Sequence, residues 1–264
     1  MSSPTSRGGS LRHILVTGAA GAIGSAIARE LRALYPSARL ALLDRDAASM
    51  NALAATLGNA STHGVDLRDL AALPPLVEAL NQTAPVDGLV NCAGIMRVLG
   101  VQSWDWDDAA GLMTIDLLAP LRLQDLVVGN MIAAKQGLIL NIASMAGKVP
   151  LKGCAYYGAS KAGLAMASEI ARAELAPHGI SVITVYPGPV HSPLEQGARH
   201  DYGGGGLFGR FAPTGDPAEL ARRITGAIAK NDPRVIYPRL YNVGWTAPNV
   251  ARWIALSYGP PPVA

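Results

Sequence analysis

The stretch HILVTGAAGAIGSAIARELRAL, residues 13–34, decides the fold that this sequence predicts. Its first five residues, His13 to Thr17, are mostly aliphatic, which is typical of a buried strand. Its second half predicts a helix with one apolar face, because apolar residues recur at helical spacing at Ile23, Ile27, Leu31 and Leu34. The stretch therefore predicts a strand, a tight turn and a helix in direct succession.

The turn itself, TGAAGAIG at residues 17–24, has the glycines and the placement that phosphate binding requires. Glycine lets main-chain N–H groups approach a pyrophosphate, which then lies at the positive end of the helix. A tight turn without a ligand is the alternative, but the flanking strand and helix favour a dinucleotide. The residues predicted to contact it are Gly18, Ala20, Gly21, Ala22, Ile23 and Gly24.

An acidic residue, Asp44, ends the next aliphatic run twenty residues beyond Gly24. A carboxylate there can accept hydrogen bonds from both hydroxyls of an adenosine ribose, and it repels a 2′-phosphate. The sequence therefore favours NAD over NADP, although Arg45 could grip a phosphate. A cap for the following helix is the alternative role of Asp44. Asp66 and Leu67 are predicted near the adenine edge, with a plain turn residue as the alternative for Asp66.

The rest of the chain repeats the pattern of a short aliphatic run followed by a longer amphipathic segment. This pattern predicts βαβ units in a single α/β domain, with a parallel sheet covered by helices on both faces. The predicted strands are His13–Thr17, Arg39–Asp44, Thr62–Asp66, Val86–Asn91, Leu138–Ile142, Ser181–Tyr186 and Val235–Tyr237. The later helices are predicted at Ala47–Leu57, Asp69–Leu80 (kinked or shortened by Pro74 and Pro75), Ala109–Ala134, Cys154–Ala176 and Pro217–Lys230.

Composition narrows the class of protein. Hydrophobic residues make up 50% of the 264 residues and charged residues 16%, which is typical of a well-buried globular enzyme. The net charge of +3 is not gathered into a basic stripe, so we expect no nucleic-acid partner. Cys92 and Cys154 are too far apart for a CxxC clip, and the histidines lack metal-ligand spacing. We therefore predict no metal, no disulfide framework, no membrane span and a cytoplasmic location.

Three segments are expected to lie outside the regular pattern. Residues 1–10 are polar and predict a flexible N-terminal tail, so that residues 11–264 make up the domain. Residues 187–214 are rich in Pro, Gly and Ser, which predicts a mobile substrate loop or lid, with a disordered surface loop as the alternative. Residues 240–264 are a C-terminal extension whose apolar side chains are expected to pack on the domain or on a partner subunit.

Five short motifs, in order along the chain, resemble those of the short-chain dehydrogenase/reductase family, in its shorter branch. The turn at residues 17–24 resembles TGxxxGxG, and residues 91–94, NCAG, resemble NNAG with Cys for the second Asn. Residues 157–161 match YxxxK, and Ser144 lies thirteen residues before that motif, at the spacing of the family's catalytic Ser. Residues 187–192 resemble PGxVxT with Ser for Thr. The match covers nearly all of residues 11–230.

This resemblance implies a single doubly wound Rossmann-type domain with about seven strands, commonly assembled as a homodimer or homotetramer through the long helices before and after Ser144. It implies an NAD-dependent interconversion of an alcohol and a carbonyl. Further cofactor contacts implied by it are Asn91, Ala93, Gly94, Tyr157, Lys161, Pro187, Gly188, Val190 and Ser192. Singly, Asn91 also fits a strand-end hydrogen bond, and Pro187-Gly188 a simple turn.

The catalytic group implied by the resemblance is Ser144, Tyr157 and Lys161. Positions four apart lie on one face of a helix, so Tyr157 and Lys161 can point into the same cleft. A nearby ammonium stabilises a phenolate, so Tyr157 is expected to exchange a proton with the substrate oxygen while Lys161 holds the nicotinamide ribose. Ser144 is expected to hydrogen-bond that oxygen. A packed Tyr and an exposed Lys on an amphipathic helix are the alternative.

One departure from the family is Asp116, where the family usually carries an Asn that supports a water chain to the active-site Lys. We expect activity to survive this change with an altered pH dependence. Asp116 also motivates an alternative function, a catalytically weak cofactor-binding sensor or regulatory protein. An epimerase or dehydratase is a weaker alternative, because such enzymes usually have a longer substrate domain.

The leading prediction is an alcohol dehydrogenase or carbonyl reductase that acts on a small or medium, fairly apolar molecule. This expectation about the substrate rests on four apolar residues that fall near the expected mouth of the cleft: Met96, Met145, Leu151 and Leu194.

Overall fold

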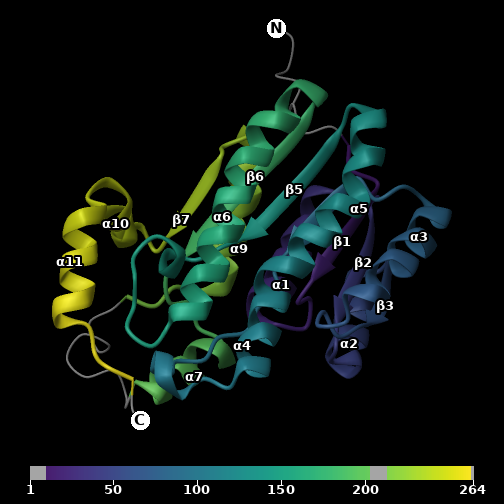
Figure 1. Cartoon of the computed structure of the whole chain (residues 1–264). Helices are drawn as coiled ribbons and strands as arrows, with labels where there is room; N and C mark the ends of the chain where they lie inside the picture. Colours follow the sequence, from purple (N-terminus) through teal and green to yellow (C-terminus); the bar gives the residue numbers. More distant parts are fainter. Residues whose placement is uncertain (1–9, 203–212, 263–264) are drawn as a thin grey trace, which may run out of the picture.

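The computed structural model describes residues 10–202 and 213–262. Its strands are β1 (His13–Thr17), β2 (Arg39–Asp44), β3 (Ala60–Gly64), β4 (Gly88–Asn91), β5 (Gly137–Ile142), β6 (Ile180–Pro187) and β7 (Arg234–Tyr237). They form one parallel sheet in the order β3-β2-β1-β4-β5-β6-β7 (Figure 1). The strand order reverses between β1 and β4, which is where a doubly wound sheet opens a crevice. The predicted single α/β domain of Rossmann type is confirmed.

Helices cover both faces of this sheet (Figure 1). They are α1 (Ala22–Leu34), α2 (Ala47–Leu57), α3 (Leu73–Thr83), α4 (Trp106–Met113), α5 (Ala119–Ala134), α6 (Ala155–Leu175), α7 (Pro193–Asp201), α9 (Pro217–Lys230), α10 (Asn242–Thr246) and α11 (Pro248–Tyr258). One buried cluster joins the sheet to α1, α2 and α9, for example through Leu31 and Ile224. A second cluster joins the other face to α3, α5 and α6 through residues such as Val77 and Leu123. Both faces are therefore buried, as a parallel sheet requires.

The helix predicted at residues 109–134 is longer and contains a π-helical turn. It begins at Trp106, because the Asp105 side chain accepts hydrogen bonds from the N–H groups of Asp107 and Asp108. A π-helical turn at Thr114–Leu118 separates α4 from α5. Within the described residues, this continuous helix, Trp106–Ala134, is the one that is long and apolar enough to cross a membrane by length and composition. Its residues Leu123 and Val127 are fully buried in the second cluster, so one face of this helix packs in the core of the domain.

Several predicted elements have different bounds in the structure. The fourth strand begins at Gly88 and not at Val86, and β5, β6, β7 and α6 differ from the prediction by one residue at one or both ends. The third strand lies at residues 60–64 and not at 62–66, because this polar edge strand takes its register from pairing with β2, where Leu40 lies opposite Ala60. The helix predicted from Asp69 begins as a short 3₁₀ turn, and α3 follows with its prolines in the first turn. Proline is tolerated there because the first helical N–H groups have no partner within the helix.

The segment predicted as a structureless loop, 187–214, is partly helical. The hydroxyl of Ser192 accepts a hydrogen bond from the N–H of Glu195 and caps α7, which starts at Pro193. The Gly-rich run at residues 203–206 lies outside the described residues. A polar N-cap followed by proline signals the start of a helix. The sequence analysis missed this signal because it judged the segment by its overall content of Pro, Gly and Ser.

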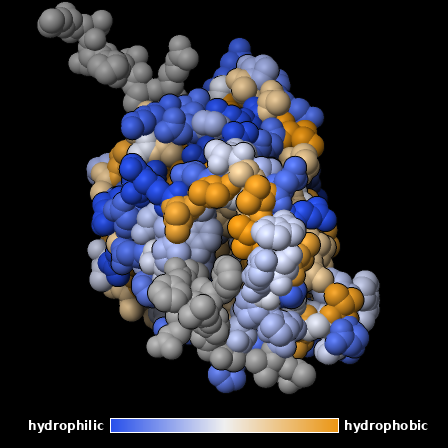
Figure 2. Space-filling model, turned by 90° about the vertical axis from the view of Figure 1, so that its left-hand side faces the viewer, coloured by the Kyte–Doolittle hydropathy of each residue, from blue (hydrophilic) through white to orange (hydrophobic). Residues whose placement is uncertain are grey.

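The C-terminal extension folds into α10 and α11, which lie beyond β7 at the edge of the molecule (Figure 1). Met145, Val149 and Ala251 surround Gly244 of α10, so this end of the chain packs on the domain. Figure 2 faces this end and shows hydrophobic residues gathered among hydrophilic ones. The expectation that the extension packs on the domain agrees with these contacts.

Candidate active site

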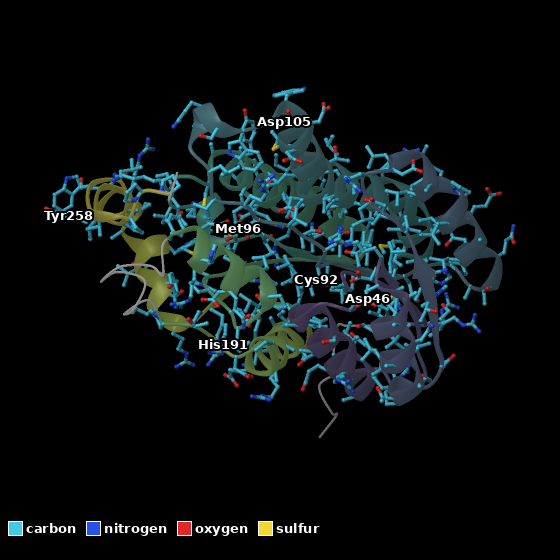
Figure 3. All side chains as sticks on the ribbon, turned by 90° about the horizontal axis from the view of Figure 1, so that it is seen from below. Asp46, Cys92, Met96, Asp105, His191 and Tyr258 are labelled. Atoms are coloured by element: carbon cyan, nitrogen blue, oxygen red, sulfur yellow. The ribbon has the colours of Figure 1, made fainter. Side chains whose placement is uncertain are left out.

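A large pocket, of about 1130 Å³, opens at the carboxyl ends of the strands. Figure 3 looks at this end, with Cys92 and Met96 near the middle, Asp46 on the side of β2 and α2, and Tyr258 at the far end of α11. The pocket is lined by all but one of the predicted site residues. The location agrees with the rule that ligands bind where the strand order reverses.

The glycine-rich turn is shaped by close backbone contacts. Gly18 has a φ of +65°, and a Cβ there would lie 2.7 Å from the backbone of Ala93. A Cβ on Gly24 would lie 2.1 Å from the carbonyl oxygen of Gly18, so this position admits no side chain. Gly21 precedes the first turn of α1 and carries no side-chain cap. The residues at the start of α1 line the pocket, and the first N–H groups of a helix, which have no partner within it, suit a pyrophosphate.

Asp44 lines the pocket next to this turn. One carboxylate oxygen accepts a hydrogen bond from the N–H of Ala20 at 3.0 Å, and the other accepts from the N–H of Arg45 at 2.7 Å. The cap of α2 is Asp46, whose side chain accepts from the N–H of Ser49. The alternative role of Asp44 as a helix cap is therefore wrong. Its carboxylate supports the turn and faces the space beyond it.

The predicted adenine-side residues also line the pocket, but Asp66 is engaged locally. Its carboxylate accepts hydrogen bonds from the main chain and the guanidinium of Arg68. These hydrogen bonds hold the pKa of Asp66 at about 2. Asp66 lies two residues after β3 and not at its end, and it organises the loop that places Leu67 at the pocket wall.

Asn91 is the one predicted cofactor contact that does not line the pocket. It is buried, and its side-chain amide donates to Asn141 Oδ1 at 2.8 Å and to the carbonyl of Pro120. These hydrogen bonds give Asn91 a structural role that ties β4 to β5, and its contact with a cofactor stays a prediction. Thr17 is a residue that the sequence analysis missed: its hydroxyl accepts from the N–H groups of Cys92 and Ala93 and so holds the chain after β4 against the glycine-rich turn.

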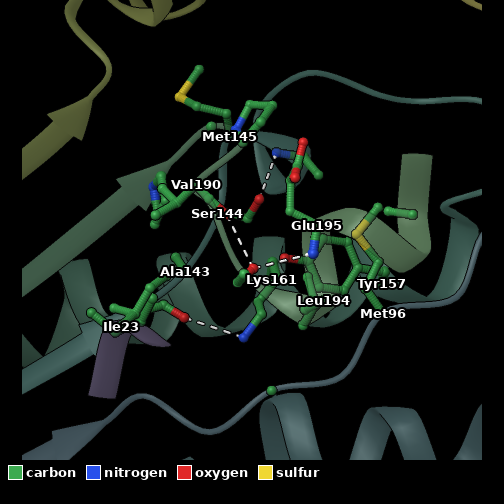
Figure 4. Close-up of a pocket in the computed structure, with 18 of the residues that line it drawn as sticks. Ile23, Met96, Ala143, Ser144, Met145, Tyr157, Lys161, Val190, Leu194 and Glu195 are labelled. Atoms are coloured by element: carbon green, nitrogen blue, oxygen red, sulfur yellow. Dashed lines mark hydrogen bonds between the residues drawn. The ribbon is translucent and has the colours of Figure 1, made fainter. Parts of the chain in front are cut away.

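Ser144, Tyr157 and Lys161 come together in the pocket (Figure 4). Ser144 follows β5, while Tyr157 and Lys161 lie one turn apart on α6, and all three are buried. The Lys161 ammonium donates to the carbonyl of Ile142 at 3.2 Å and lies 5.9 Å from the centre of the Tyr157 ring. The alternative of an exposed Lys on an amphipathic helix is therefore wrong.

The electrostatics around Tyr157 differ from the simple expectation. Burial raises the pKa of the Tyr157 phenol, while Lys161 and a hydrogen bond with Ser144 act to lower it. The raising effects, which include the nearby carboxylate of Asp116, prevail, so the pKa of Tyr157 stays above its ordinary value. Lys161 thus acts to lower the pKa of Tyr157, as predicted. Its effect alone does not bring that pKa below the ordinary value of the phenol.

The loop after β6 completes the wall near the catalytic group. Pro187, Gly188, Val190 and Ser192 line the pocket. A Cβ on Gly188 would lie 2.6 Å from the ring of Tyr241, so glycine is required where the C-terminal extension closes on this loop. Val190 forms a β-bridge with Gly215, which makes the stretch more than a simple turn.

The far end of the pocket is mostly apolar. Met96, Met145, Leu151 and Leu194, expected near the mouth, all line it. Helices α10 and α11 also contribute residues to the pocket wall, which the sequence analysis did not identify, because a helical pattern alone does not show what a helix faces. These residues are Val243, Gly244, Val250, Ala251, Ile254 and Ala255. Glu195 and Tyr202 of the segment after β6 add polar atoms to this end. Across residues 10–202 and 213–262, no group of three or more His, Cys, Asp or Glu side chains is placed to hold a metal ion.

A Rossmann-type sheet with a glycine-rich turn and a Ser-Tyr-Lys group at its switch point defines a class, the nicotinamide-dependent oxidoreductases. Residues 12–203 match the family model of the short chain dehydrogenases. The chain therefore belongs to the short-chain dehydrogenase/reductase family.

Three relatives illustrate the range of this similarity. The ketoacyl reductase HetN of Nostoc is 34% identical over 68% of this chain, and the match spans 63% of that longer protein. D-threitol dehydrogenase of Mycolicibacterium smegmatis is 33% identical over 78% of this chain and 82% of its own length. The structure of a short-chain dehydrogenase from Sphingobium yanoikuyae in complex with NADPH has a TM-score of 0.76 at 27% identity, over 94% of this chain and 96% of that one.

Proposed function

We propose that this protein is an NAD-dependent oxidoreductase that interconverts an alcohol and a carbonyl on a fairly apolar small molecule. The observation that carries the proposal is that Ser144, Tyr157 and Lys161 line the same pocket as the glycine-rich turn. A protein that only bound a dinucleotide would have no use for a buried acid–base Tyr beside a buried Lys.

The proposed roles follow from the geometry. The nicotinamide cofactor supplies or accepts the hydride when bound. Tyr157 gives a proton to the substrate oxygen during reduction and takes it back during oxidation. Lys161 stabilises the phenolate and holds the ribose hydroxyls, and Ser144 donates a hydrogen bond to the oxygen as charge develops on it.

The proposed cofactor preference rests on Asp44. Its carboxylate lines the pocket at the place where the second strand ends, and a carboxylate repels a 2′-phosphate. Arg45 is exposed and adjacent, so the charge near this position is mixed. The Sphingobium yanoikuyae structure holds NADPH, and the preference of this chain for NAD is a proposal to be tested directly.

We propose that the substrate end is enclosed by two segments, the described part of residues 187–214 and the extension at 240–264. The substrate class follows from the lining, which is mostly Met, Leu, Ile, Val and Ala with few polar groups. Both cysteines are free thiols, which supports the proposed cytoplasmic location.

The test is binding of NADH and NADPH to the purified protein, followed by turnover of a mixed panel of ketones and secondary alcohols. The Tyr157→Phe variant should keep NADH binding and lose at least about a hundredfold in turnover, because the acid–base group contributes that much. Tyr156→Phe is the matched control, since Tyr156 packs edge-on against Trp104 and should leave turnover unchanged.

The second candidate function is a cofactor-binding sensor, favoured by Asp116 next to Lys161. Binding of NADH with no turnover on the whole panel would support the sensor and count against the enzyme. Binding of neither cofactor would exclude both functions.

A further inference from the structure

Asp116 is the one acidic side chain among the described residues that forms an ion pair with the catalytic Lys161. It lies on the π-helical turn between α4 and α5 and is fully buried. Its Oδ1 accepts a hydrogen bond from the N–H of Ile95 at 2.8 Å, which fixes the carboxylate in place. Its Oδ2 lies 3.5 Å from Lys161 Nζ and has no hydrogen-bond partner, so this oxygen is free to act on the ammonium alone.

The space between the two groups is tightly limited. A Cβ on Gly94 would lie 3.1 Å from Lys161 Nζ and 3.4 Å from Asp116 Oδ1. Lys161 also donates a hydrogen bond to the carbonyl of Ile142. The ammonium thus has a carbonyl oxygen at 3.2 Å and a carboxylate oxygen at 3.5 Å, and the centre of the Tyr157 ring lies 5.9 Å away.

We propose that Asp116 is a positioning residue that holds the Lys161 ammonium and sets the pH at which Tyr157 releases its proton. The proposal rests on the proposed oxidoreductase function and adds a control on its pH range. A buried carboxylate offsets the positive charge that Lys161 presents to Tyr157, and this offset is strong because the pair is shielded from water.

The titration behaviour of the pair agrees with this geometry. Burial lowers the pKa of Lys161, but the opposing charges, of which Asp116 is the largest, raise it above its ordinary value. Burial raises the pKa of Asp116, and Lys161 works against that increase. Lys161 therefore stays an ammonium at neutral pH, and Asp116 raises the pKa of Tyr157.

The other titratable groups facing this cluster have weaker effects. Cys92, directly after β4, is partly buried, and loss of solvation raises the pKa of its thiol to about 12, so it stays neutral in the working range. Cys154, at the start of α6, is also buried with a raised pKa, and it faces Tyr157. Asp44 acts on Cys92 from β2. Among these groups, Asp116 is the one carboxylate that acts directly on both Lys161 and Tyr157.

The closing experiment compares the full-length protein with Asp116→Asn, which keeps an oxygen for the N–H of Ile95 and removes the charge. Asp107→Asn is the matched control, because Asp107 is exposed on the first turn of α4 in the same continuous helix. Asp116→Ser removes the same charge with a smaller side chain and serves as the second neutral variant.

Two quantities are measured for each protein. The first is the pH profile of kcat/KM for alcohol oxidation. The second is the titration of Tyr157, followed by tyrosinate absorbance in the cofactor-free protein. The same titration of a protein that also carries Tyr157→Phe is subtracted, so that the difference belongs to Tyr157. In Asp116→Asn, the acidic limb of the profile and the Tyr157 titration should both move to lower pH by about one unit, because a positive charge on Lys161 is no longer offset. Asp107→Asn should move neither.

The two measurements separate this proposal from the proposed function. An unchanged Tyr157 titration in both neutral variants would overturn the proposal, and Asp116 would then be only an acceptor for the N–H of Ile95. A shifted titration without any turnover would support the Asp116 proposal and count against the enzyme function. A shifted pH profile with an unshifted Tyr157 titration would also overturn the Asp116 proposal, because Asp116 would then affect turnover without changing the pKa of Tyr157.

Discussion

At the scale of single residues, Asp44 and Asp116 show how a carboxylate changes role with its surroundings. Asp44 is partly exposed and accepts a hydrogen bond from the N–H of Ala20 in the glycine-rich turn. Its charge therefore acts on whatever lies in the pocket beside Ala20. Asp116 is fully buried, and its charge acts on Lys161. The same functional group is therefore proposed to act on the choice of cofactor at one position and on proton transfer at the other.

The residue-scale prediction concerns Asp44→Asn. This variant keeps an oxygen for the N–H of Ala20 but removes the charge that repels a 2′-phosphate, so the preference for NADH over NADPH should fall by about tenfold. The measurement is the dissociation constant of each reduced cofactor by fluorescence titration. Asp69→Asn is the control, because Asp69 caps the 3₁₀ turn before α3 and does not line the pocket. An unchanged ratio would show that Asp44 only supports the turn.

At the scale of elements, α11 is a helix with two different faces. Val250, Ala251, Ile254 and Ala255 line the pocket, and Val250 is also 54% exposed. Trp253 and Leu256 are exposed and do not line the pocket, and no residue of α11 is fully buried. Elements with few buried contacts are the ones that move most readily, which suits a wall that adapts to the substrate.

The element-scale prediction is that Ile254→Ala changes KM by an amount that depends on the size of the substrate. Removing three carbons from the wall should raise KM about tenfold for a bulky apolar ketone, with little change for a small one and little change in kcat. Trp253→Ala, one residue away on the outer face, should change neither constant. Equal effects on small and bulky ketones would show that α11 does not contact the substrate.

At the scale of the whole molecule, α5 and α6 lie side by side on one face of the sheet (Figure 1). Three large apolar residues on this side are between 45% and 65% exposed: Leu118 on the π-helical turn, and Met166 and Ile170 on α6. We propose that this face joins two copies of the chain, in line with the implied homodimer or homotetramer.

The corresponding prediction is that Met166→Glu dissociates the assembly, because it places a charge in the centre of an apolar interface. Sedimentation velocity should show a protein of larger mass for the wild type and a monomer for the variant. Ala55→Glu, exposed on α2 at the opposite side of the sheet, should leave the mass unchanged. A wild-type protein that sediments as a monomer would contradict the proposal.

The sequence alone was sufficient for the features that depend on neighbouring residues. The glycine-rich turn, the spacing of Tyr157 and Lys161, and the alternation of strands and helices are local patterns, and steric and helical geometry allow few other structures for them. Boundaries were less predictable where pairing or packing decides them, as in β3, whose polar residues carry no apolar alternation and whose register comes from β2.

By itself, then, the sequence determined the α/β domain, the glycine-rich turn and the candidate catalytic group. Only the tertiary structure decided that Asn91 donates a hydrogen bond to Asn141, that α11 lines the apolar end of the pocket, and that Asp116 reaches Lys161. The reason is physical: each of these contacts joins segments that are far apart in the chain, and their distance depends on how whole elements pack, which no local pattern of residues encodes.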